Sequence, residues 1–151
     1  MNKACPIILR DRHGITEILG FSHPLAGKQL VKGTIENGET LEQACARELI
    51  EESGIAATPS KFLGEWNSGY EGQIWGFYLM RIAEKLPDHW EFSTSDDGGH
   101  IFSFFWHRLD EIPDPQWHPL FAGAINFVKK AITDFPDEVV TFPLAQGAPL
   151  D

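Results

Sequence analysis

The sequence predicts an α/β fold in which helices cover both faces of a β-sheet. The strongest strand pattern, at residues 73–82, is apolar on both faces, because Trp75, Phe77 and Leu79 alternate with Ile74, Tyr78 and Met80. A strand that is apolar on both faces lies in a sheet between two other layers. Helical patterns at residues 41–53 and from His118 onward can supply these layers, so we expect an α/β/α sandwich.

The helix at residues 41–53 has clear start and stop signals. Thr40 and Gln43 form a capping box at its beginning. Gly54 supplies the left-handed conformation that ends a helix, and Ile55 after it can fold back as an apolar contact.

Four strands are predicted in the first half of the chain. Residues 3–9 and 14–21 predict two strands joined by a turn, and Pro6 indicates an edge position for the first one. Residues 61–68 predict a third strand, which a glycine-bounded turn joins to the buried strand at 73–82.

The second half of the chain predicts a long loop, a strand and a helix. Residues 83–99 are polar and rich in turn residues, and loops of this length in a domain are usually functional or mobile. Residues 100–109 predict an aromatic strand. The helix that begins at His118-Pro119 has apolar residues at helical spacing, and residues 139–142 predict a short strand.

Composition limits the class of protein. A chain of 151 residues with 42% hydrophobic residues suits a single domain, residues 1–151. The net charge of −10 argues against a polymeric nucleic-acid partner, although metal ions let an acidic protein bind a small polyphosphate. The apolar run near the N-terminus is too short for a signal peptide or a membrane span, so we expect no membrane association and a cytoplasmic location. Cys5 and Cys45 are expected to be free thiols in the core.

Three carboxylates cluster near the end of the first helix. Glu48, Glu51 and Glu52 stand at positions i, i+3 and i+4, so they project from one face. Like charges at this spacing repel, and carboxylates in the last turn face the negative end of the helix dipole. A solvated acidic helix end is one interpretation. The other is a site for a hard divalent cation, which would compensate for both penalties.

The surroundings of this cluster resemble the Nudix box. From Gly33, five residues precede Glu39 and seven more precede Arg47-Glu48, after which Leu49, Glu51-Glu52, Gly54 and Ile55 follow at the box spacing. The resemblance implies the Nudix-type α/β/α sandwich around a mixed β-sheet. It also implies an enzyme that hydrolyses a nucleoside diphosphate linked to another moiety, with magnesium, or alternatively manganese, as the cofactor.

The resemblance assigns roles to individual residues of the box. Glu48 and Glu52 are implied as metal ligands, Glu51 as a third, and Lys32 through its backbone carbonyl. Arg47 is implied to orient the site by pairing with Glu39, although it can also pair with Glu51 at i+4. Gly33 is implied to allow close backbone approach, and Gly54 to end the helix.

The catalytic base stays open between two kinds of carboxylate. In some family members the residue equivalent to Glu48 accepts the proton, and in others a carboxylate in a distant loop does so. Candidates in residues 83–100 are Glu91, Asp96, Asp97 and His100, of which Asp97 is the preferred extra ligand or base. The alternative is that residues 96–99 are simply a turn.

Aromatic side chains suggest a substrate pocket without defining it. Residues that could stack on a base are Trp66, Tyr70, Trp75, Trp90, Phe102, Phe104 and Trp106. Aromatic residues in strands are more often core, so Tyr70 and Trp90, in predicted loops, are the better candidates. His89, His107 and His118 show no metal-ligand spacing and are interpreted as surface or packing residues.

Two other functions share the predicted fold. One is a Nudix-fold module that binds a nucleotide or metabolite without hydrolysing it, and an eroded box would indicate it. The other is a pyrophosphate-bond isomerase of the isoprenoid type, for which no cysteine is clearly placed. The substrate is expected to be a small nucleotide or pyrophosphate compound of unknown identity. Family members are often dimers, so a homodimer is one expectation.

Overall fold

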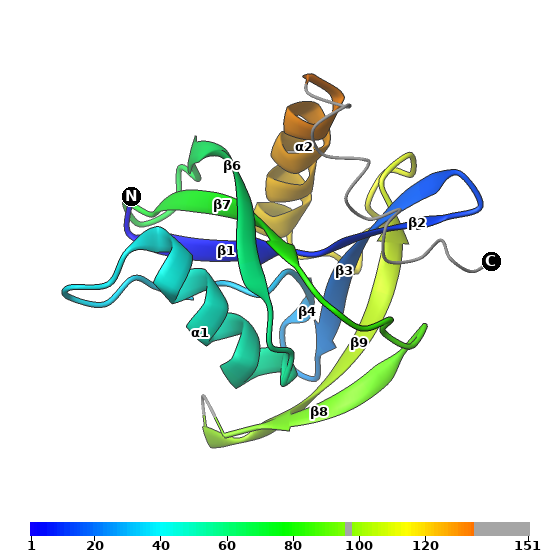
Figure 1. Ribbon diagram of the computed structural model, residues 1–151, viewed down its shortest axis with the longest axis horizontal. Helices are drawn as coiled ribbons and strands as arrows, with labels where there is room; N and C mark the ends of the chain where they lie inside the picture. The colour runs from blue at the N-terminus through cyan, green and yellow to red at the C-terminus, as the bar shows by residue number, and fades with distance from the viewer. Residues whose placement is uncertain (96–97, 135–151) are drawn as a thin grey trace.

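The protein is described by a computed structural model that covers residues 1–95 and 98–134. Its strands in chain order are β1 (Lys3–Ile7), β2 (Leu9–Arg12), β3 (Ile15–His23), β4 (Gly27–Gln29), β5 (Gly33–Thr34), β6 (Thr58–Asn67), β7 (Ile74–Arg81), β8 (Trp90–Thr94) and β9 (His100–Arg108). Its helices are α1 (Leu41–Ser53) and α2 (Pro119–Asp134) (Figure 1).

The strands form two sheets. One has the order β5-β1-β7-β6, and the other has the order β2-β3-β9-β8, with β4 paired to β3. β1 and β7 run parallel, whereas β1 and β5 and also β6 and β7 run antiparallel, so the first sheet is mixed as expected. The expected mixed sheet is therefore present. The remaining strands form a second sheet, in which all pairs are antiparallel.

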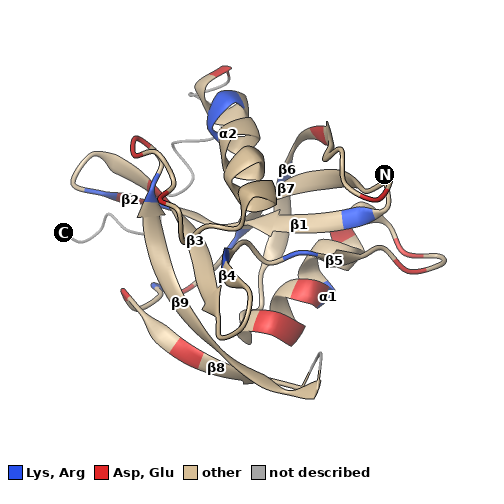
Figure 2. Ribbon diagram, turned by 180° about the vertical axis from the view of Figure 1, so that it is seen from behind, with Lys and Arg blue, Asp and Glu red and all other residues tan. Residues whose placement is uncertain are grey.

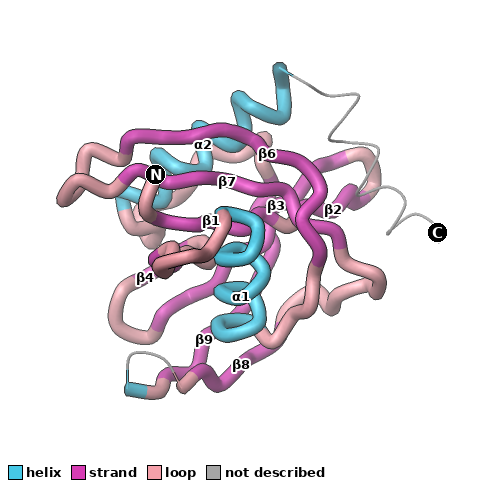
Figure 3. The backbone as a smooth tube through the Cα atoms, turned by 60° about the vertical axis from the view of Figure 1, so that its left-hand side comes forward, coloured by secondary structure: helices cyan, strands magenta, loops and turns pink. Residues whose placement is uncertain are grey.

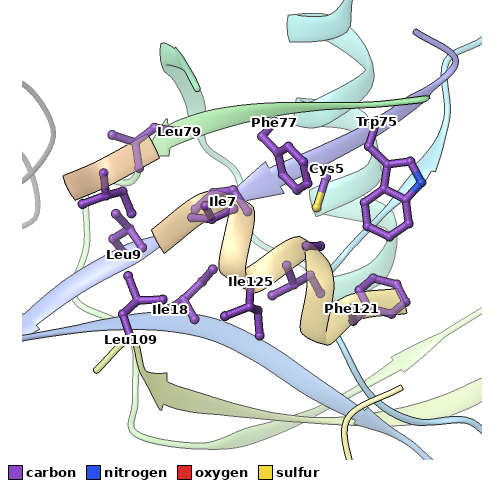
Figure 4. Packing of buried hydrophobic residues seen from close by; sticks show 14 of the residues in the cluster. Cys5, Ile7, Leu9, Ile18, Trp75, Phe77, Leu79, Leu109, Phe121 and Ile125 are labelled. Atoms are coloured by element: carbon purple, nitrogen blue, oxygen red, sulfur yellow. The ribbon is translucent and has the colours of Figure 1, made fainter. Parts of the chain in front are cut away.

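The two helices pack on opposite faces of the mixed sheet. α2 buries Phe121 and Ile125 against Cys5, Ile7 and the apolar face of β7, as Figure 4 shows. α1 instead buries Leu41, Ala44, Cys45 and Leu49 in a second apolar cluster, which includes Met80 of β7. The figures show α1 and α2 on opposite sides of β1 and β7 (Figures 1 and 2). The prediction that both faces of the strand at 73–82 are covered is confirmed.

α1 begins and ends where the local signals predicted. The Thr40 side chain accepts from the Gln43 amide, and the Gln43 side chain accepts from the Thr40 amide, so the capping box is formed. Gly54 has φ 77°, and its amide donates to the Ile50 carbonyl. Ile55 is buried in the same apolar cluster as α1. These contacts are local in sequence, which is why the sequence predicted them.

The edge prediction for Pro6 holds for only part of its strand. β1 lies between β5 and β7, so it is not an edge strand over Lys3 and Ala4. Its pairing with β5 stops at Ala4, whereas its pairing with β7 continues to Ile7. Pro6 therefore lies where one side of β1 needs no amide donor.

The predicted loop at residues 83–99 is wrong over part of its length, because β8 lies within it. Trp90, Phe92 and Thr94 alternate with Glu91 and Ser93, and the two aromatic side chains pack against the α1 cluster. β8 pairs with β9 at the edge of the second sheet and lies beside the C-terminal end of α1 (Figure 3). The strand was missed because polar and turn residues on both sides of it obscure its period-two pattern.

Contacts with the second sheet hold the segment between β7 and β8. Trp106 donates from Nε1 to the Pro87 carbonyl at 2.9 Å, and the Arg10 guanidinium lies 4.3 Å from the centre of a Trp106 ring. Arg10 also pairs with Glu17 at 2.7 Å and with Asp88 at 2.9 Å. Trp106 of β9 and Arg10 of β2 therefore hold this segment, and Glu17 of β3 in turn pairs with Arg10.

Two further sequence expectations concern cysteines and membranes. Cys5 and Cys45 are both buried free thiols, which confirms the prediction, and burial raises the pKa of Cys45 to about 12. Neither α1 nor α2, the helices within the described part of the chain, has the length and apolar character needed to cross a bilayer.

Candidate active site

The side chain of Glu48, in α1, lies against Gly33 of β5. The Glu48 side chain is buried, with 7% of the residue exposed. A Cβ atom built on Gly33 would collide with the carboxyl carbon and both carboxyl oxygens of Glu48. Glycine at position 33 therefore leaves the space that the Glu48 carboxylate fills, in agreement with the predicted close backbone approach.

Arg47 connects the carboxylates of the site. Its Nε and Nη2 donate to the two oxygens of Glu39 at 2.6 and 2.9 Å. Its Nη1 donates to Glu48 at 2.8 Å and to Glu51 at 3.2 Å, and its Nη2 also donates to the Thr34 carbonyl at 2.9 Å. The sequence offered Glu39 and Glu51 as partners for Arg47, and the structure contains both pairings.

Glu39 fixes the turn that precedes α1. One of its oxygens accepts from the Glu36 amide at 3.0 Å, so this carboxylate bridges the turn and Arg47. The hydrogen bonds from Arg47, followed by that from the Glu36 amide, lower the pKa of Glu39 to about 2. Glu39 is therefore ionised at neutral pH, and it holds Arg47 in the orientation that reaches Glu48.

The three box carboxylates differ in their surroundings. Burial raises the pKa of Glu48, although hydrogen bonding and charge from Arg47 act in the opposite direction. Glu51 is more exposed, and its backbone carbonyl accepts from Thr94 Oγ1 at 3.0 Å, which ties α1 to β8. Glu52 lines a pocket beside the helix. In Figure 2, acidic residues appear in red along the ribbon of α1.

These residues fit a magnesium site that is completed by water and substrate. The candidate donors are all oxygen atoms, which hard cations prefer, and Gly33 leaves room for one carboxylate against the backbone. Within residues 1–95 and 98–134, no three His, Cys, Asp or Glu side chains converge as a preformed metal cage. Magnesium commonly binds through one or two protein carboxylates together with waters and phosphates, so this arrangement suits it.

The Lys32 side chain is partly buried and lies near two aromatic rings. Its Nζ is 4.9 Å from the centre of a Trp75 ring and 5.8 Å from the centre of the Phe121 ring, and it donates to Gln73 Oε1 at 3.2 Å. Burial lowers the pKa of Lys32, and the neighbouring charge of Lys3 adds to this effect. The sequence interpretation assigned only the backbone carbonyl of Lys32 to the site.

A pocket of about 360 Å³ opens beside Glu52 and the Lys32 side chain. Its wall comes from β3, β9, the turn between β6 and β7, and the start of α2. The ring side chains in this wall are Phe21, His23, Tyr70, Phe102, His118 and Phe121. A carboxylate and an ammonium at one side of an aromatic pocket can bind a ligand that is both anionic and planar.

Some of the aromatic candidates line the pocket, and others pack in the core. Tyr70 and Phe102 line the pocket, as the sequence allowed. Trp90 does not lie in a loop: it stacks on Phe104, with ring centres 5.0 Å apart and an angle of 7° between the planes. Trp75 is fully buried.

Sequence reasoning missed two histidines of the pocket. His118 was interpreted as a surface or packing residue, and His23 was not considered. They are 95 positions apart in the sequence, and only the packing of α2 beside β3 brings them to one wall. The position of His118 before Pro119 signalled the start of a helix, but no local pattern indicated that this start borders a pocket.

The candidate bases outside the box are only partly placed. Asp96 and Asp97 lie outside the described residues. Glu91 lies on the exposed face of β8, opposite to Trp90 and Phe92, so it points away from α1. The His100 ring lies 4.8 Å from that of His23, which itself lines the pocket. Of these candidates, Glu91 thus faces away from α1, and His100 lies beside a residue of the pocket wall.

Comparison with known proteins shows the family of the chain. A family model described as NUDIX domain matches residues 3–126. A protein named NAD-capped RNA hydrolase NudC, from Klebsiella pneumoniae, is 31% identical over 104 residues, which are 69% of this chain and 33% of that protein. The corresponding protein of Vibrio cholerae is 30% identical over 84 residues, 56% of this chain and 29% of the relative. This chain thus spans about a third of the length of these relatives.

Solved structures show the same fold at low sequence identity. A binary complex of an Ap4A hydrolase from C. elegans has a TM-score of 0.63 and 21% identity, covering 89% of this chain and 98% of the other. An ADP-ribose pyrophosphatase from Streptococcus suis has a TM-score of 0.61 and 15% identity, covering 85% and 89%. The predicted layered α/β fold is confirmed by these likenesses.

Proposed function

Since this chain belongs to the family described as NUDIX domain, we propose that it hydrolyses a pyrophosphate bond, with a divalent metal, in a nucleoside diphosphate linked to a second moiety. The observation that supports this most is the Glu48 carboxylate seated against Gly33 and held by Arg47. This arrangement places an ionisable oxygen pair beside a backbone edge, at the position where the box resemblance implies metal ligation.

The box residues have different roles in the proposed reaction. Glu48, Glu51 and Glu52 would hold magnesium, with manganese as the alternative, and the Lys32 carbonyl would complete the set. The ion would supply charge stabilisation for the phosphoryl oxygens and lower the pKa of a bound water. Arg47 keeps the Glu48 carboxylate in place, and Glu39 in turn keeps Arg47 in place. Glu48 is the proposed acceptor of the water proton, with Asp97 as the alternative.

The substrate is proposed only as a class. The similar proteins are named for NAD-capped RNA, ADP-ribose and Ap4A, all of which contain a nucleoside joined through a pyrophosphate or longer phosphate bridge. We favour a small nucleotide, because a chain with a net charge of −10 is poorly suited to bind a phosphate backbone. The exclusion of RNA stays a prediction, and a capped oligonucleotide therefore belongs in the substrate screen. A cytoplasmic location and a homodimer likewise stay predictions.

Turnover of a substrate panel with and without magnesium tests this proposal. The panel contains nucleoside triphosphates, dinucleoside polyphosphates, ADP-ribose, nucleotide sugars and NAD-capped RNA. On the best substrate we expect Glu52→Gln to lower turnover at least about a hundredfold, because even the loss of residues that only support metal ligands costs 10- to 100-fold. Glu42→Gln is the matched control, because Glu42 lies in the first turn of the same helix. Turnover of Glu52→Gln within a few fold of the parent would reject the assignment.

The non-catalytic binding module is the second candidate. It predicts tight nucleotide binding without product under any divalent metal. The intact box, with the Arg47 to Glu39 and Glu48 contacts formed, favours the hydrolase. The isoprenoid-type isomerase needs an accessible protonating residue, and both cysteines are buried in the structure.

A further inference from the structure

We propose that the pocket beside Glu52 binds the nucleobase of the substrate, and that the Lys32 ammonium binds the phosphate next to that nucleoside. This inference rests on the proposed function, since it names the two subsites on one side of the bond to be cut. The sequence had pointed to residues 83–100 for substrate recognition. The structure instead assigns it to side chains from β3, the turn before β7, and the start of α2.

The aromatic part of the wall suits a planar ring. Phe21 and Phe102 stack on each other with ring centres 4.3 Å apart, which makes a rigid floor. Tyr70, in contrast, lies in the turn at residues 69–72, has 48% of its surface exposed, and lines the opening. A buried aromatic floor with an exposed aromatic ring at the rim favours a stacking ligand over a bare sugar or an alkyl chain.

The polar groups of the wall favour a ring with hydrogen-bond acceptors. His23 Nδ1 accepts from the Leu25 amide at 3.0 Å, and His118 Nδ1 accepts from the Leu120 amide at 3.2 Å. A neutral imidazole that accepts at Nδ1 carries its proton at Nε2, so each ring has its donor on the far nitrogen. Nucleobases present acceptor nitrogens and carbonyls at their edges, which a donor at His118 Nε2 would match.

Lys32 is the group that suits the adjoining phosphate. The start of α2 borders the pocket, but its first amides are occupied: those of Phe121 and Ala122 donate to the His118 carbonyl, and Pro119 has no N–H. The helix terminus is therefore not a ready anion site. Lys32 lines the pocket together with Glu52, and its ammonium lies 5.8 Å from the centre of the Phe121 ring in the same wall.

The size of the pocket fits one nucleoside rather than a dinucleotide. Its volume of about 360 Å³ lies at the lower end of the range of about 300 to 1,000 Å³ typical of small-ligand sites. The pocket therefore has room for one base with its ribose, and the second moiety would lie outside it. Such a site recognises the nucleoside closely and tolerates variation beyond the bond that is cut.

Binding of two ligands that differ only in the base tests this inference without any turnover. AMP and ribose 5-phosphate carry the same phosphate and ribose, and only AMP carries a nucleobase. Isothermal titration calorimetry in EDTA measures both affinities on the intact chain. We expect AMP to bind at least about tenfold more tightly, because stacking of one base on aromatic side chains has an effect of this order.

Two variants separate the two subsites. We expect Tyr70→Leu to lower the affinity for AMP about fivefold to tenfold and to leave the affinity for ribose 5-phosphate unchanged, since it removes only stacking. Phe62→Leu is the matched control, because Phe62 is also 48% exposed but does not line the pocket. We expect Lys32→Met, which keeps an unbranched side chain but removes the ammonium, to weaken the binding of both ligands about tenfold. Lys129→Met, an exposed lysine of α2, is its control.

The nucleobase subsite, its location in this pocket and the role of Lys32 are each contradicted by a different result. Equal affinity for the two ligands in the parent, or no measurable AMP binding, overturns the nucleobase subsite. An equal effect of Tyr70→Leu and Phe62→Leu overturns the assignment to this pocket, and unchanged phosphate affinity in Lys32→Met overturns the role of Lys32. If AMP binds as expected while no substrate is hydrolysed, the proposed hydrolysis fails and the subsite stands.

Discussion

The carboxylate of Glu48 occupies the space that a Cβ atom on Gly33 would fill. This contact joins α1 to the short strand β5. The guanidinium of Arg47 links the same two elements, because it donates to the Glu48 carboxylate and to the Thr34 carbonyl. Glycine is therefore required at position 33 for steric reasons, because a side chain there would displace a carboxylate of the proposed metal site.

We expect alanine at position 33 to lower turnover strongly and to lower the free energy of unfolding only a little. The added methyl group must push the Glu48 carboxylate away, so we expect Gly33→Ala to lower turnover at least about a hundredfold. Gly38→Ala is the control: Gly38 has φ +80° and nothing near its Cβ position, so alanine there strains only the backbone. We expect it to lower stability by about 1 kcal/mol and to keep turnover. Similar turnover in both variants would contradict the proposed role of Gly33.

The pairing of Glu39 with Arg47 predicts a defined pH dependence of stability. The folded pKa of Glu39, about 2, lies below the unfolded value of about 4.3, so its contribution is complete above the unfolded value. It is lost as the pH falls from about 5 toward 2. Urea unfolding of Glu39→Gln and the parent at several pH values measures this. We expect the parent to be more stable at pH 7 and the difference to vanish near pH 2; a difference that does not change with pH would contradict the pairing.

The contacts of Trp106 predict how the segment before β8 is held. Trp106→Phe removes the donor to the Pro87 carbonyl and weakens the stacking of Arg10, so we expect a loss of about 1 to 2 kcal/mol in the free energy of unfolding. Proteolysis should then begin between β7 and β8, and mass spectrometry of the first fragments identifies the site. An unchanged unfolding midpoint together with unchanged proteolysis would show that the segment is held by other contacts.

Both thiols are expected to be unreactive in the folded protein. With a pKa of about 12, Cys45 is thiolate in only about one molecule in ten thousand at pH 8, and Cys5 is also buried with a raised pKa. Labelling with a thiol reagent should therefore be slow in buffer and fast in denaturant, with two thiols counted after unfolding. Rapid labelling of either cysteine under native conditions would contradict the described packing.

Features that depend on neighbouring residues could be predicted from the sequence. The capping box at Thr40, the left-handed Gly54 and the face shared by Glu48, Glu51 and Glu52 all follow from spacing along one helix. The covering of both faces of β7 also follows, because the apolar residues alternate without a polar face. The box resemblance further predicted the pairing of Arg47 with Glu39, which the structure contains.

Features that depend on tertiary packing could not be predicted in this way. β8 was hidden within a polar stretch, because an edge strand needs only one apolar face, formed here by Trp90 and Phe92. The pocket was hidden for another reason: His23 and His118 are far apart in the sequence, and only the fold brings both into the pocket wall. Asp97, which the sequence favoured among the loop candidates for an extra ligand or base, lies outside the described residues and stays a prediction.

The box carboxylates are proposed to support attack of water on a pyrophosphate bond. Turnover of the best substrate in water enriched in oxygen-18, followed by mass spectrometry of the phosphate-containing products, shows whether water supplies the new phosphate oxygen. We predict one oxygen-18 atom in a phosphorylated product with magnesium, no labelled product in EDTA, and at least about a hundredfold less labelled product in the same time with Glu52→Gln. Tight nucleotide binding with no labelled product under any divalent metal would contradict the claim and identify the protein as a binding module.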